Sequence, residues 1–275
     1  MKKWYAVIGD PISHSLSPFM HESWFDEYDI DAAYLPIHVE PSQLEKSFEA
    51  MKTLGISGFN ITLPHKQSIV PLLGKLEESA MQMNAVNTVN FDGTHYLGSN
   101  TDGDGFVRSM LAHSVGKASK VLLIGAGGAA RGIACALKRA GFTDVTITNR
   151  TFRRAEELAA ETGGTAVTLI ESEERLAEFG VLIQTTSVGL ATGEALPISL
   201  ERVKAGTLVA DIIYNPLETP FLKKAEEKNC ITLNGVGMFV YQGAIAFEKW
   251  TGIQPNTEKM IQLITEKLGG TYVND

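Results

Sequence analysis

"VLLIGAGGAARGIACAL", residues 121 to 137, runs from an apolar segment through three glycines into a segment of helical apolar spacing. The apolar start suits a buried strand, and Gly125 allows the tight turn that follows it. Gly127 would let a pyrophosphate approach the backbone closely, and the small Ala130 would let the helix lie near the strand. The N-terminus of that helix would offer free N–H groups to phosphates. Glycine turns are common, but one set between this strand and this helix predicts a dinucleotide-binding fold.

The end of the next strand distinguishes between cofactors. An Asp or Glu about 20 residues after the glycine turn normally holds the ribose hydroxyls of NAD and repels a 2′-phosphate. Here the sequence is "TNRTFRR", residues 148 to 154, with Asn149, Arg150 and Thr151 followed by Arg153 and Arg154. Three arginines at a helix start oppose the helix dipole, which makes a plain solvated helix start a poor explanation. A guanidinium matches phosphate geometry, so the pattern favours NADP over NAD.

Composition limits the possible functions. The chain has 275 residues, of which 44% are hydrophobic and 20% charged, as in a folded protein of about two domains. Its formal charge of −8 argues against nucleic acid as a partner, although a local basic pocket can still bind a small anion. Cys135 and Cys230 are the only cysteines, so we expect neither disulfides nor a zinc site, and a reducing cytoplasm.

Membrane insertion is not expected. The apolar run Trp4 to Ile8 ends at Gly9 and is too short for a signal peptide. The longest apolar tract, 121 to 137, contains Arg131 and several glycines and falls short of a bilayer span.

Strand-like and helical segments alternate along the chain, which predicts an α/β fold with largely parallel sheets. We expect an α/β substrate domain over residues 1–102 and a doubly wound, Rossmann-type NADP domain over 103–237. Two helical segments, within 238–275, would pack back on the first domain. Ligands in such folds bind beyond the carboxyl ends of the strands.

Three further stretches combine turn residues with polar side chains. "GDPISHSLSPFMHES", residues 9 to 23, holds Ser15 and Ser17, and Ser17 could simply cap a helix that begins at Pro18. "NITLPHKQSIV", residues 60 to 70, places Lys66 after a strand and a proline. "NAVNTVN" supplies Asn87, whose plain role would be turn chemistry at a strand end. We expect His65 to be structural.

Together these stretches resemble the shikimate dehydrogenase family. The resemblance covers the chain from its first strand to its C-terminal helices and rests on eight motifs in order: "GDPISHSLSP", "GFNITLPHK", "AVNT", "SNTDGDGF", "GAGGAARG", "NRTFRR", "TTSVGL" and "NGVGMFVYQGAIAFEKWTG". It implies NADP-dependent interconversion of 3-dehydroshikimate and shikimate, on the route to aromatic amino acids. It also implies a small-molecule partner, with the chain a monomer or a homodimer.

The family pattern implies the following site residues. Substrate would be held by Ser15, Ser17, Thr62, Lys66, Asn87, Asp102, Tyr214 and Gln242. Cofactor would be held by Gly125, Ala126, Gly127, Gly128, Ala129, Asn149, Arg150, Thr151, Arg154, Ile212, Gly235, Glu78 and Thr186. Of the two adjacent arginines Arg154 is preferred for the 2′-phosphate, and Arg153 stays an alternative. No metal site is implied.

Lys66 and Asp102 would be the catalytic residues. A charged lysine stabilises the alkoxide that forms when a ketone accepts hydride, and it can donate the proton. Asp102 could orient Lys66, but a carboxylate neighbour also keeps a lysine charged and so hinders it as a base. Whether Lys66, Asp102 or a water molecule carries the proton stays open.

Two other functions are compatible with the sequence. A related enzyme could oxidise quinate as well as shikimate with NAD, although no acidic residue follows the second strand of the cofactor domain. A non-catalytic sensor of dinucleotide or metabolite could use the same fold. The presence of both Lys66 and Asp102 argues against the sensor.

Overall fold

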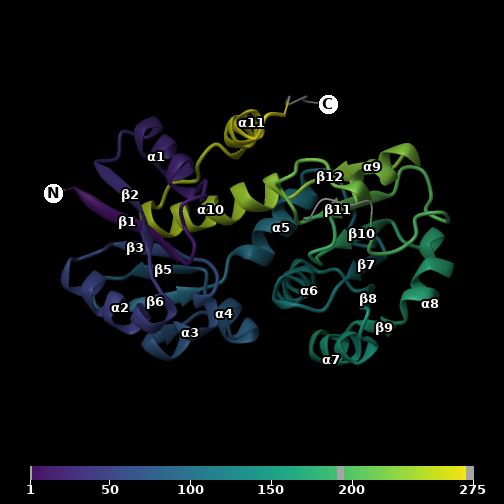
Figure 1. Cartoon of the computed structure of the whole chain (residues 1–275), viewed down its shortest axis with the longest axis horizontal. Helices are drawn as coiled ribbons and strands as arrows, with labels where there is room; N and C mark the ends of the chain where they lie inside the picture. The colour runs from purple at the N-terminus through teal and green to yellow at the C-terminus, as the bar shows by residue number, and fades with distance from the viewer. Residues whose placement is uncertain (1, 191–194, 271–275) are drawn as a thin grey trace. The chain divides into compact units, whose positions relative to one another are not determined.

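A computed structural model describes residues 2–190 and 195–270 of the chain (Figure 1). It forms two compact units. The first contains the residues up to Thr101 together with Gln242–Met260, and the second contains Asp102–Tyr241 and the residues from Ile261 on. The segment 238–275 is thus divided between the units, and its last five residues lie outside the described ranges.

The first unit is built on a mixed sheet in the order β2-β1-β3-β5-β6-β4. The pairs β1–β2, β1–β3 and β4–β6 are parallel, whereas β3–β5 and β5–β6 are antiparallel. The strands are β1 (Lys3–Gly9), β2 (Ala32–His38), β3 (Gly58–Ile61), β4 (Lys75–Leu76), β5 (Thr88–Phe91) and β6 (Tyr96–Ser99).

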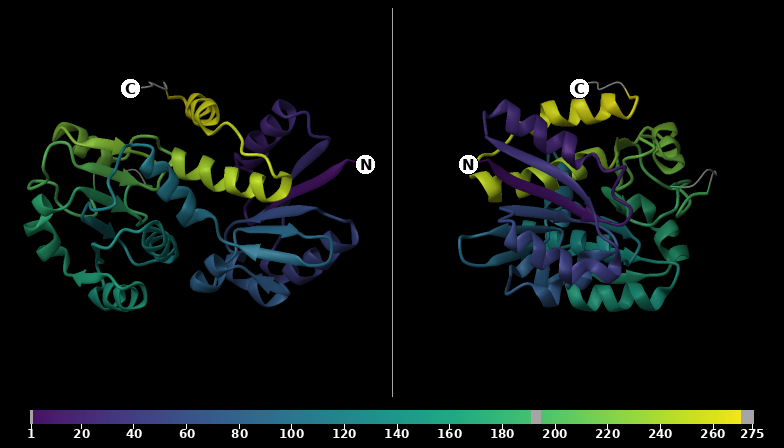
Figure 2. Two further views of the ribbon diagram at one scale, coloured as in Figure 1. Left: turned by 180° about the vertical axis from the view of Figure 1, so that it is seen from behind. Right: turned by 60° about the vertical axis from the view of Figure 1, so that its left-hand side comes forward.

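Helices cover both faces of this sheet because its strand residues alternate between them. Ala6, Ile8 and Phe59 pack against Phe48 and Met51 of α2, while Tyr5 lies on the other face. Figure 1 and Figure 2 show α2, α3 and α4 on one side and α1 on the other. The helical elements are α1 (Ser17–Glu27), η1 (Pro41–Gln43), α2 (Leu44–Thr53), α3 (His65–Ser68), η2 (Val70–Leu72) and α4 (Glu78–Met83).

The second unit has a fully parallel sheet in the order β12-β11-β10-β7-β8-β9. If β7 is counted as the first strand of this sheet, the order from β9 to β12 is 3-2-1-4-5-6, which is the order of the doubly wound Rossmann fold. The strands are β7 (Val121–Ile124), β8 (Val145–Thr148), β9 (Thr165–Val167), β10 (Val181–Gln184), β11 (Leu208–Asp211) and β12 (Ile231–Leu233).

Both faces of the second sheet are buried, which explains its continuous apolar strands. Val121 and Leu123 pack toward α5, α6 and α7, whereas Leu122 and Ile124 pack toward α9. The helices are α5 (Asp102–Leu111), α6 (Gly128–Ala140), α7 (Phe152–Thr162), α8 (Leu169–Glu174), η3 (Leu176–Glu178) and α9 (Pro220–Glu227). The last two, α10 (Val236–Thr251) and α11 (Thr257–Lys267), have residues in both units.

The expected fold class is confirmed, with a Rossmann-type second sheet. One local expectation was wrong. Ser17 does not cap α1: the cap position is Leu16, and the Ser17 N–H instead donates to Oγ of Ser15, 3.2 Å away. Within the described ranges, no helix is both long enough and apolar enough to span a bilayer.

Candidate active site

The two loops after β1 and β3 lie against each other in the first unit. The Asp10 N–H donates to the Leu63 carbonyl (3.0 Å), and the Thr62 N–H donates to the Ile8 carbonyl (3.0 Å). A side chain at Gly9 would collide with the methyl group of Thr62, so glycine at the end of β1 lets the second loop approach. The loop that carries Ser15 and Ser17 therefore begins beside Thr62.

The backbone of Lys66 is hydrogen-bonded to Val86, the residue before Asn87. Its carbonyl accepts the Val86 N–H at 2.7 Å, and its side chain is half-buried on the short helix α3. The neighbouring His65 is 1% exposed and bonds through Nε2 to the Val39 carbonyl at 2.6 Å. That contact confirms the structural role expected for His65 and fixes the backbone from which Lys66 extends.

The Asn87 side chain is oriented by its neighbours. Its Oδ1 accepts the Thr101 N–H at 2.9 Å and the Thr88 hydroxyl at 3.0 Å. The amide nitrogen is therefore the end that donates, to Oγ1 of Thr101 (3.0 Å) and to Oε1 of Gln242 on α10 (3.4 Å). The structure thus brings Asn87 and Gln242 together from positions 155 residues apart.

A second layer of polar residues lies behind Asn87. Nδ2 of Asn60 on β3 donates to the Asn87 carbonyl and to Oγ1 of Thr88, both at 3.1 Å. Oδ1 of Asn60 accepts the hydroxyl of Tyr34 on β2 at 2.7 Å. Burial raises the pKa of Tyr34 well above its usual value, with the Ser17 hydroxyl opposing this in part. Tyr34, Asn60, Thr88 and Asn87 are all buried and hydrogen-bonded to one another, so Asn87 is held rigidly.

In the second unit, the glycine turn after β7 is shaped for a ligand. Gly125 has φ +116°, and a side chain there would collide with Oγ1 of Thr185. By contrast, a side chain at Gly127 or Gly128 would meet no atom within 4 Å, so the packing of the protein does not require glycine there. The N-terminus of α6 has no side-chain cap at Gly127. Open space beside free N–H groups fits a pyrophosphate, flanked by the half-buried Ala126 and Ala129.

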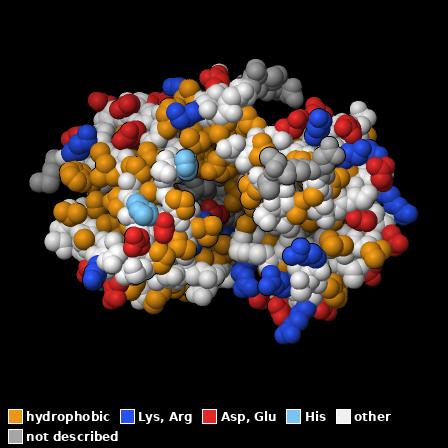
Figure 3. All heavy atoms as spheres, in the orientation of Figure 1, with side chains coloured by type: hydrophobic (Ala, Val, Ile, Leu, Met, Phe, Trp, Pro, Cys, Tyr) orange, Lys and Arg blue, Asp and Glu red, His pale blue; other side chains and the backbone are white. Residues whose placement is uncertain are grey.

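The segment after β8 lies next to this turn. The Gly125 N–H donates to the Thr148 carbonyl at 2.8 Å, and Nδ2 of Asn149 donates to the Thr151 carbonyl at 2.9 Å. Thr151 occupies the cap position of α7 without a side-chain cap bond. Lys and Arg side chains gather over the region of α6 and α7 in Figure 3, although the chain as a whole is acidic.

The exposed arginines of this segment differ in their contacts. Nε of Arg153 donates to Oε1 of Glu157, one turn further along α7, at 2.9 Å. Arg150 and Arg154 carry no such ion pair among the described residues. Their guanidinium groups are therefore the ones available to a phosphate.

The strand ends β11 and β12 bring Ile212, Tyr214 and Gly235 together. The Gly235 N–H donates to the Ile213 carbonyl at 2.9 Å, and a side chain at Gly235 would collide with the Ile212 carbonyl. The Tyr214 ring packs against Phe239 with centroids 5.3 Å apart and the ring planes tilted by 32°, and burial raises the pKa of its hydroxyl.

The loop that carries Ile212 and Tyr214 is anchored by a buried carboxylate. Asp211 accepts the Ile213 N–H at 3.0 Å and the Thr219 hydroxyl at 2.8 Å. Burial raises the pKa of Asp211 to about 6, and both hydrogen bonds oppose that rise. The loop is thus tied at both ends to one side chain.

The remaining predicted residues are distributed over both units. Thr186 lies at the glycine turn, where its methyl group would stand 3.1 Å from a side chain at Gly125. Asp102 is the half-buried first residue of α5, which packs closely on α6 where Gly103 meets Gly132. Glu78 is exposed on the first turn of α4 in the first unit and accepts Nε2 of Gln82 at 2.8 Å.

Four polar residues of the site were not predicted: Tyr34, Asn60, Thr101 and Asp211. Asn60 gave a signal, since an amide between Phe59 and Ile61 in a strand requires a buried partner. No such signal marks Tyr34, because its partner lies on another strand.

Comparisons with known proteins agree with this geometry. The family model of the shikimate dehydrogenase substrate binding domain matches residues 7–89. The models of shikimate / quinate 5-dehydrogenase and of the shikimate 5′-dehydrogenase C-terminal domain match residues 110–213 and 235–265. A shikimate dehydrogenase (NADP(+)) of Lysinibacillus sphaericus is 54% identical over 98% of this chain and 100% of its own length. The chain belongs to the shikimate dehydrogenase family.

Solved structures of the family have the same fold. A shikimate 5-dehydrogenase of Thermus thermophilus, in complex with NADP(H) and shikimate, is 34% identical with a TM-score of 0.86, over 94% of this chain and 97% of that one. One from Listeria monocytogenes, in complex with shikimate and NAD, is 30% identical with a TM-score of 0.90, over 96% of each chain. The family resemblance seen in the sequence is thereby confirmed.

Proposed function

We propose that this chain is an NADP-dependent oxidoreductase that interconverts 3-dehydroshikimate and shikimate, on the route to aromatic amino acids. The observation that carries the proposal is the cluster in the first unit, where the Lys66 carbonyl accepts the N–H of Val86, next to an Asn87 whose amide has its donor end fixed. An oriented amide suits recognition of a hydroxylated ring, and a lysine ammonium suits an oxygen that gains negative charge.

The proposed substrate residues are those that the family pattern implies. Ser15, Ser17 and Thr62 come from the two adjoining loops, and Asn87 and Gln242 form the bonded amide pair. Tyr214 and Asp102 complete the set in the second unit. The residues up to Thr101 would form the substrate domain, and the doubly wound sheet the cofactor domain.

The proposed cofactor residues of the second unit follow from its fit to a phosphorylated dinucleotide, whereas Glu78, in the first unit, follows from the family pattern alone. The 125–129 turn would hold the pyrophosphate, and Asn149, Arg150, Thr151 and Arg154 the 2′-phosphate. Ile212 and Gly235 would line the nicotinamide, with Thr186 and Glu78 as additional cofactor contacts. When bound, the nicotinamide supplies or accepts the hydride.

Lys66 has the central role in the proposed chemistry. During reduction, its ammonium stabilises the oxygen that receives negative charge, and a proton moves to that oxygen. In this proposal Asp102 accepts a hydrogen bond from a substrate hydroxyl. The location is the cytoplasm, where a biosynthetic enzyme with two free cysteines needs no disulfide.

The alternative is an enzyme that prefers quinate and NAD. The matching family model includes quinate in its description, and the Listeria monocytogenes structure contains NAD. The absence of a carboxylate between Asn149 and Arg154 favours NADP here.

The decisive experiment follows the NADPH absorbance band with shikimate or quinate as substrate and NADP or NAD as cofactor. We expect shikimate with NADP to be by far the most efficient pair. Comparable efficiency with quinate and NAD would establish the alternative instead, and no turnover with any pair would indicate a sensor.

Lys66→Ala tests the chemistry itself. We expect turnover to fall by roughly 100- to 10,000-fold, while shikimate binding stays measurable by calorimetry. Lys46→Ala, the same change at an exposed position of α2, is the matched control and should retain normal turnover. Near-normal turnover of Lys66→Ala would remove Lys66 from the mechanism.

A further inference from the structure

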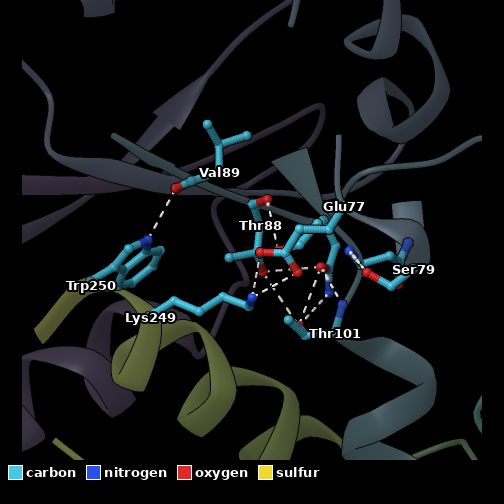
Figure 4. Close-up of polar contacts among 10 residues, drawn as sticks. Glu77, Ser79, Thr88, Val89, Thr101, Lys249 and Trp250 are labelled. Atoms are coloured by element: carbon cyan, nitrogen blue, oxygen red, sulfur yellow. Dashed lines mark hydrogen bonds and ion pairs between the residues drawn. The ribbon is translucent and has the colours of Figure 1, made fainter. Parts of the chain in front are cut away.

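An ion pair outside the proposed set of ligand-binding residues joins α10 to the sheet of the first unit. Nζ of Lys249 lies 2.6 Å and 2.8 Å from the two carboxylate oxygens of Glu77. The two side chains are only 26% and 33% exposed. Figure 4 shows the Lys249 side chain extending from α10 toward Glu77. Two ordered charges at this burial are better shielded from solvent than an ordinary surface pair.

Glu77 is a fixed point on the sheet. Its N–H donates to the Gly98 carbonyl of β6 at 2.8 Å, and its carbonyl accepts the Ala80 and Met81 N–H groups at 3.0 Å. It occupies the cap position of α4, yet its side chain does not cap that helix. A carboxylate that could cap α4 is therefore directed to α10 instead.

Lys249 lies two helical turns after Gln242, so the two side chains project from the same face of α10. The next residue, Trp250, donates its indole N–H to the Val89 carbonyl of β5 at 3.0 Å. Gly58 provides the space for that ring, since a side chain there would collide with it. The part of α10 within this unit is thus fixed to the sheet at Asn87, Glu77 and Val89.

We propose that the Glu77–Lys249 pair is a positioning device for Gln242, which sets the distance between the Gln242 carboxamide and Asn87. This rests on the proposed function, in which both amides hold shikimate. Asn87 is rigid because Thr88 and Thr101 hold it, whereas the position of Gln242 depends on how far along its axis α10 docks. Glu77 and Lys249 bond to each other and are not among the proposed ligand-binding residues, so in this proposal both act through the helix.

The test compares the steady-state constants of Lys249→Met and Glu77→Gln with those of wild type. Misplacement of a binding group by a fraction of an ångström weakens substrate binding, so we expect the KM for shikimate to rise by roughly 10-fold. The KM for NADP should stay within about twofold of wild type. Lys259→Met, which breaks the more exposed Lys259–Glu27 pair, is the matched control and should change neither constant.

Two further variants separate positioning from simple stabilisation. The charge swap Glu77→Lys with Lys249→Glu restores the pair and should recover most of the KM for shikimate. In a Gln242→Ala background, Lys249→Met should raise that KM no further, because the residue through which it acts is gone. Circular dichroism would check that each variant is folded. Lys249→Arg, which keeps the positive charge, should raise the KM for shikimate less than Lys249→Met.

The outcomes are distinct. A folded Lys249→Met with a normal KM for shikimate would overturn the proposal, as would an effect of Lys249→Met that is undiminished in Gln242→Ala or a KM in Lys249→Arg, which keeps the charge, as high as in Lys249→Met. Wild-type protein without shikimate turnover would instead overturn the proposed function.

Discussion

His21 is a fully buried histidine without a hydrogen bond of normal geometry at either ring nitrogen. Its ring stacks on Tyr34 with centroids 4.5 Å apart and is enclosed by Trp24, Phe247 and Trp250. Burial lowers its pKa from 6.5 to about 3, and the nearby Asn60 amide opposes that shift only in part. His21 therefore stays neutral in the folded chain where an unfolded chain would protonate it.

This makes His21 a source of acid sensitivity. The folded-state pKa lies below the unfolded value, so stability is complete above about pH 6.5 and is lost as the pH falls toward 3. We predict that His21→Phe, which keeps an aromatic ring, loses less stability on acidification than wild type. When the pH falls from about 7 to about 5, the free energy of unfolding should decrease by roughly 2 kcal/mol less in His21→Phe than in wild type.

Urea titrations at the two pH values measure this difference. His113→Phe, the same change at an exposed position of the chain, is the control. An equal loss of stability in His21→Phe and wild type would show that His21 is not the sensitive group.

The two adjacent arginines of α7 allow a test at matched positions. Arg153 is engaged by Glu157, so we predict that Arg154→Ala raises the KM for NADP by roughly 10- to 100-fold, as expected for loss of a charged hydrogen bond to phosphate. Arg153→Ala should have little effect, and the KM for NAD should hardly change in either variant. A larger effect at Arg153 than at Arg154 would reverse the assignment.

At the residue scale, Lys66 and Asn87 are predicted as site residues because their motifs resemble those of the family. Asn60, Tyr34 and Thr101 were not predicted, because their hydrogen-bond partners are distant in the sequence and only the fold brings them together. Whether Ser17 caps α1 was also misjudged, since Ser15 takes over the local hydrogen bond.

The glycine turn before α6 contains two glycines that are required for different reasons. Gly125 has a positive φ and closely approaches Thr185, whereas Gly127 has an ordinary φ of −91° and open space around it. We predict that Gly125→Ala destabilises the fold by about 1–3 kcal/mol. Gly127→Ala should leave the melting temperature unchanged and raise the KM for NADP by roughly 10-fold, because the new methyl group would occupy space reserved for the pyrophosphate.

Melting curves with and without NADPH, together with KM values, separate the two effects. A Gly127→Ala variant that melts early but binds NADP normally would show that the glycine is needed for the fold alone.

Long helices and strands with regular apolar spacing are easier to predict from the sequence than short ones. The helical apolar spacing seen after the glycine turn is observed as α6, Gly128–Ala140. The short strands β4, β6 and β9 have no such pattern in the sequence. Each has two to four residues, and β6 includes Gly98, so their strand conformation depends on pairing with neighbours more than on local preference.

Across the whole molecule, most candidate residues of the second unit follow the carboxyl ends of parallel strands. The glycine turn follows β7, Asn149 follows β8, Thr186 follows β10 and Ile212 follows β11. In the first unit, Gly9 and Thr62 stand after β1 and β3 in the same way. This regularity is why the strand order and the motifs together locate both candidate sites, although neither does so alone.

The proposed division of labour between the units predicts separate footprints in hydrogen exchange. A ligand slows exchange where binding disfavours local opening, so shikimate should protect peptides around 58–70 and 84–101. NADPH should protect peptides around 121–131 and 148–155. NADH, which lacks the 2′-phosphate, should protect the first of these cofactor peptides and leave the second as exposed as in the free protein. Shikimate protection confined to the glycine turn, or equal protection of 148–155 by NADH and NADPH, would contradict the assignment of the units and of the arginines, respectively.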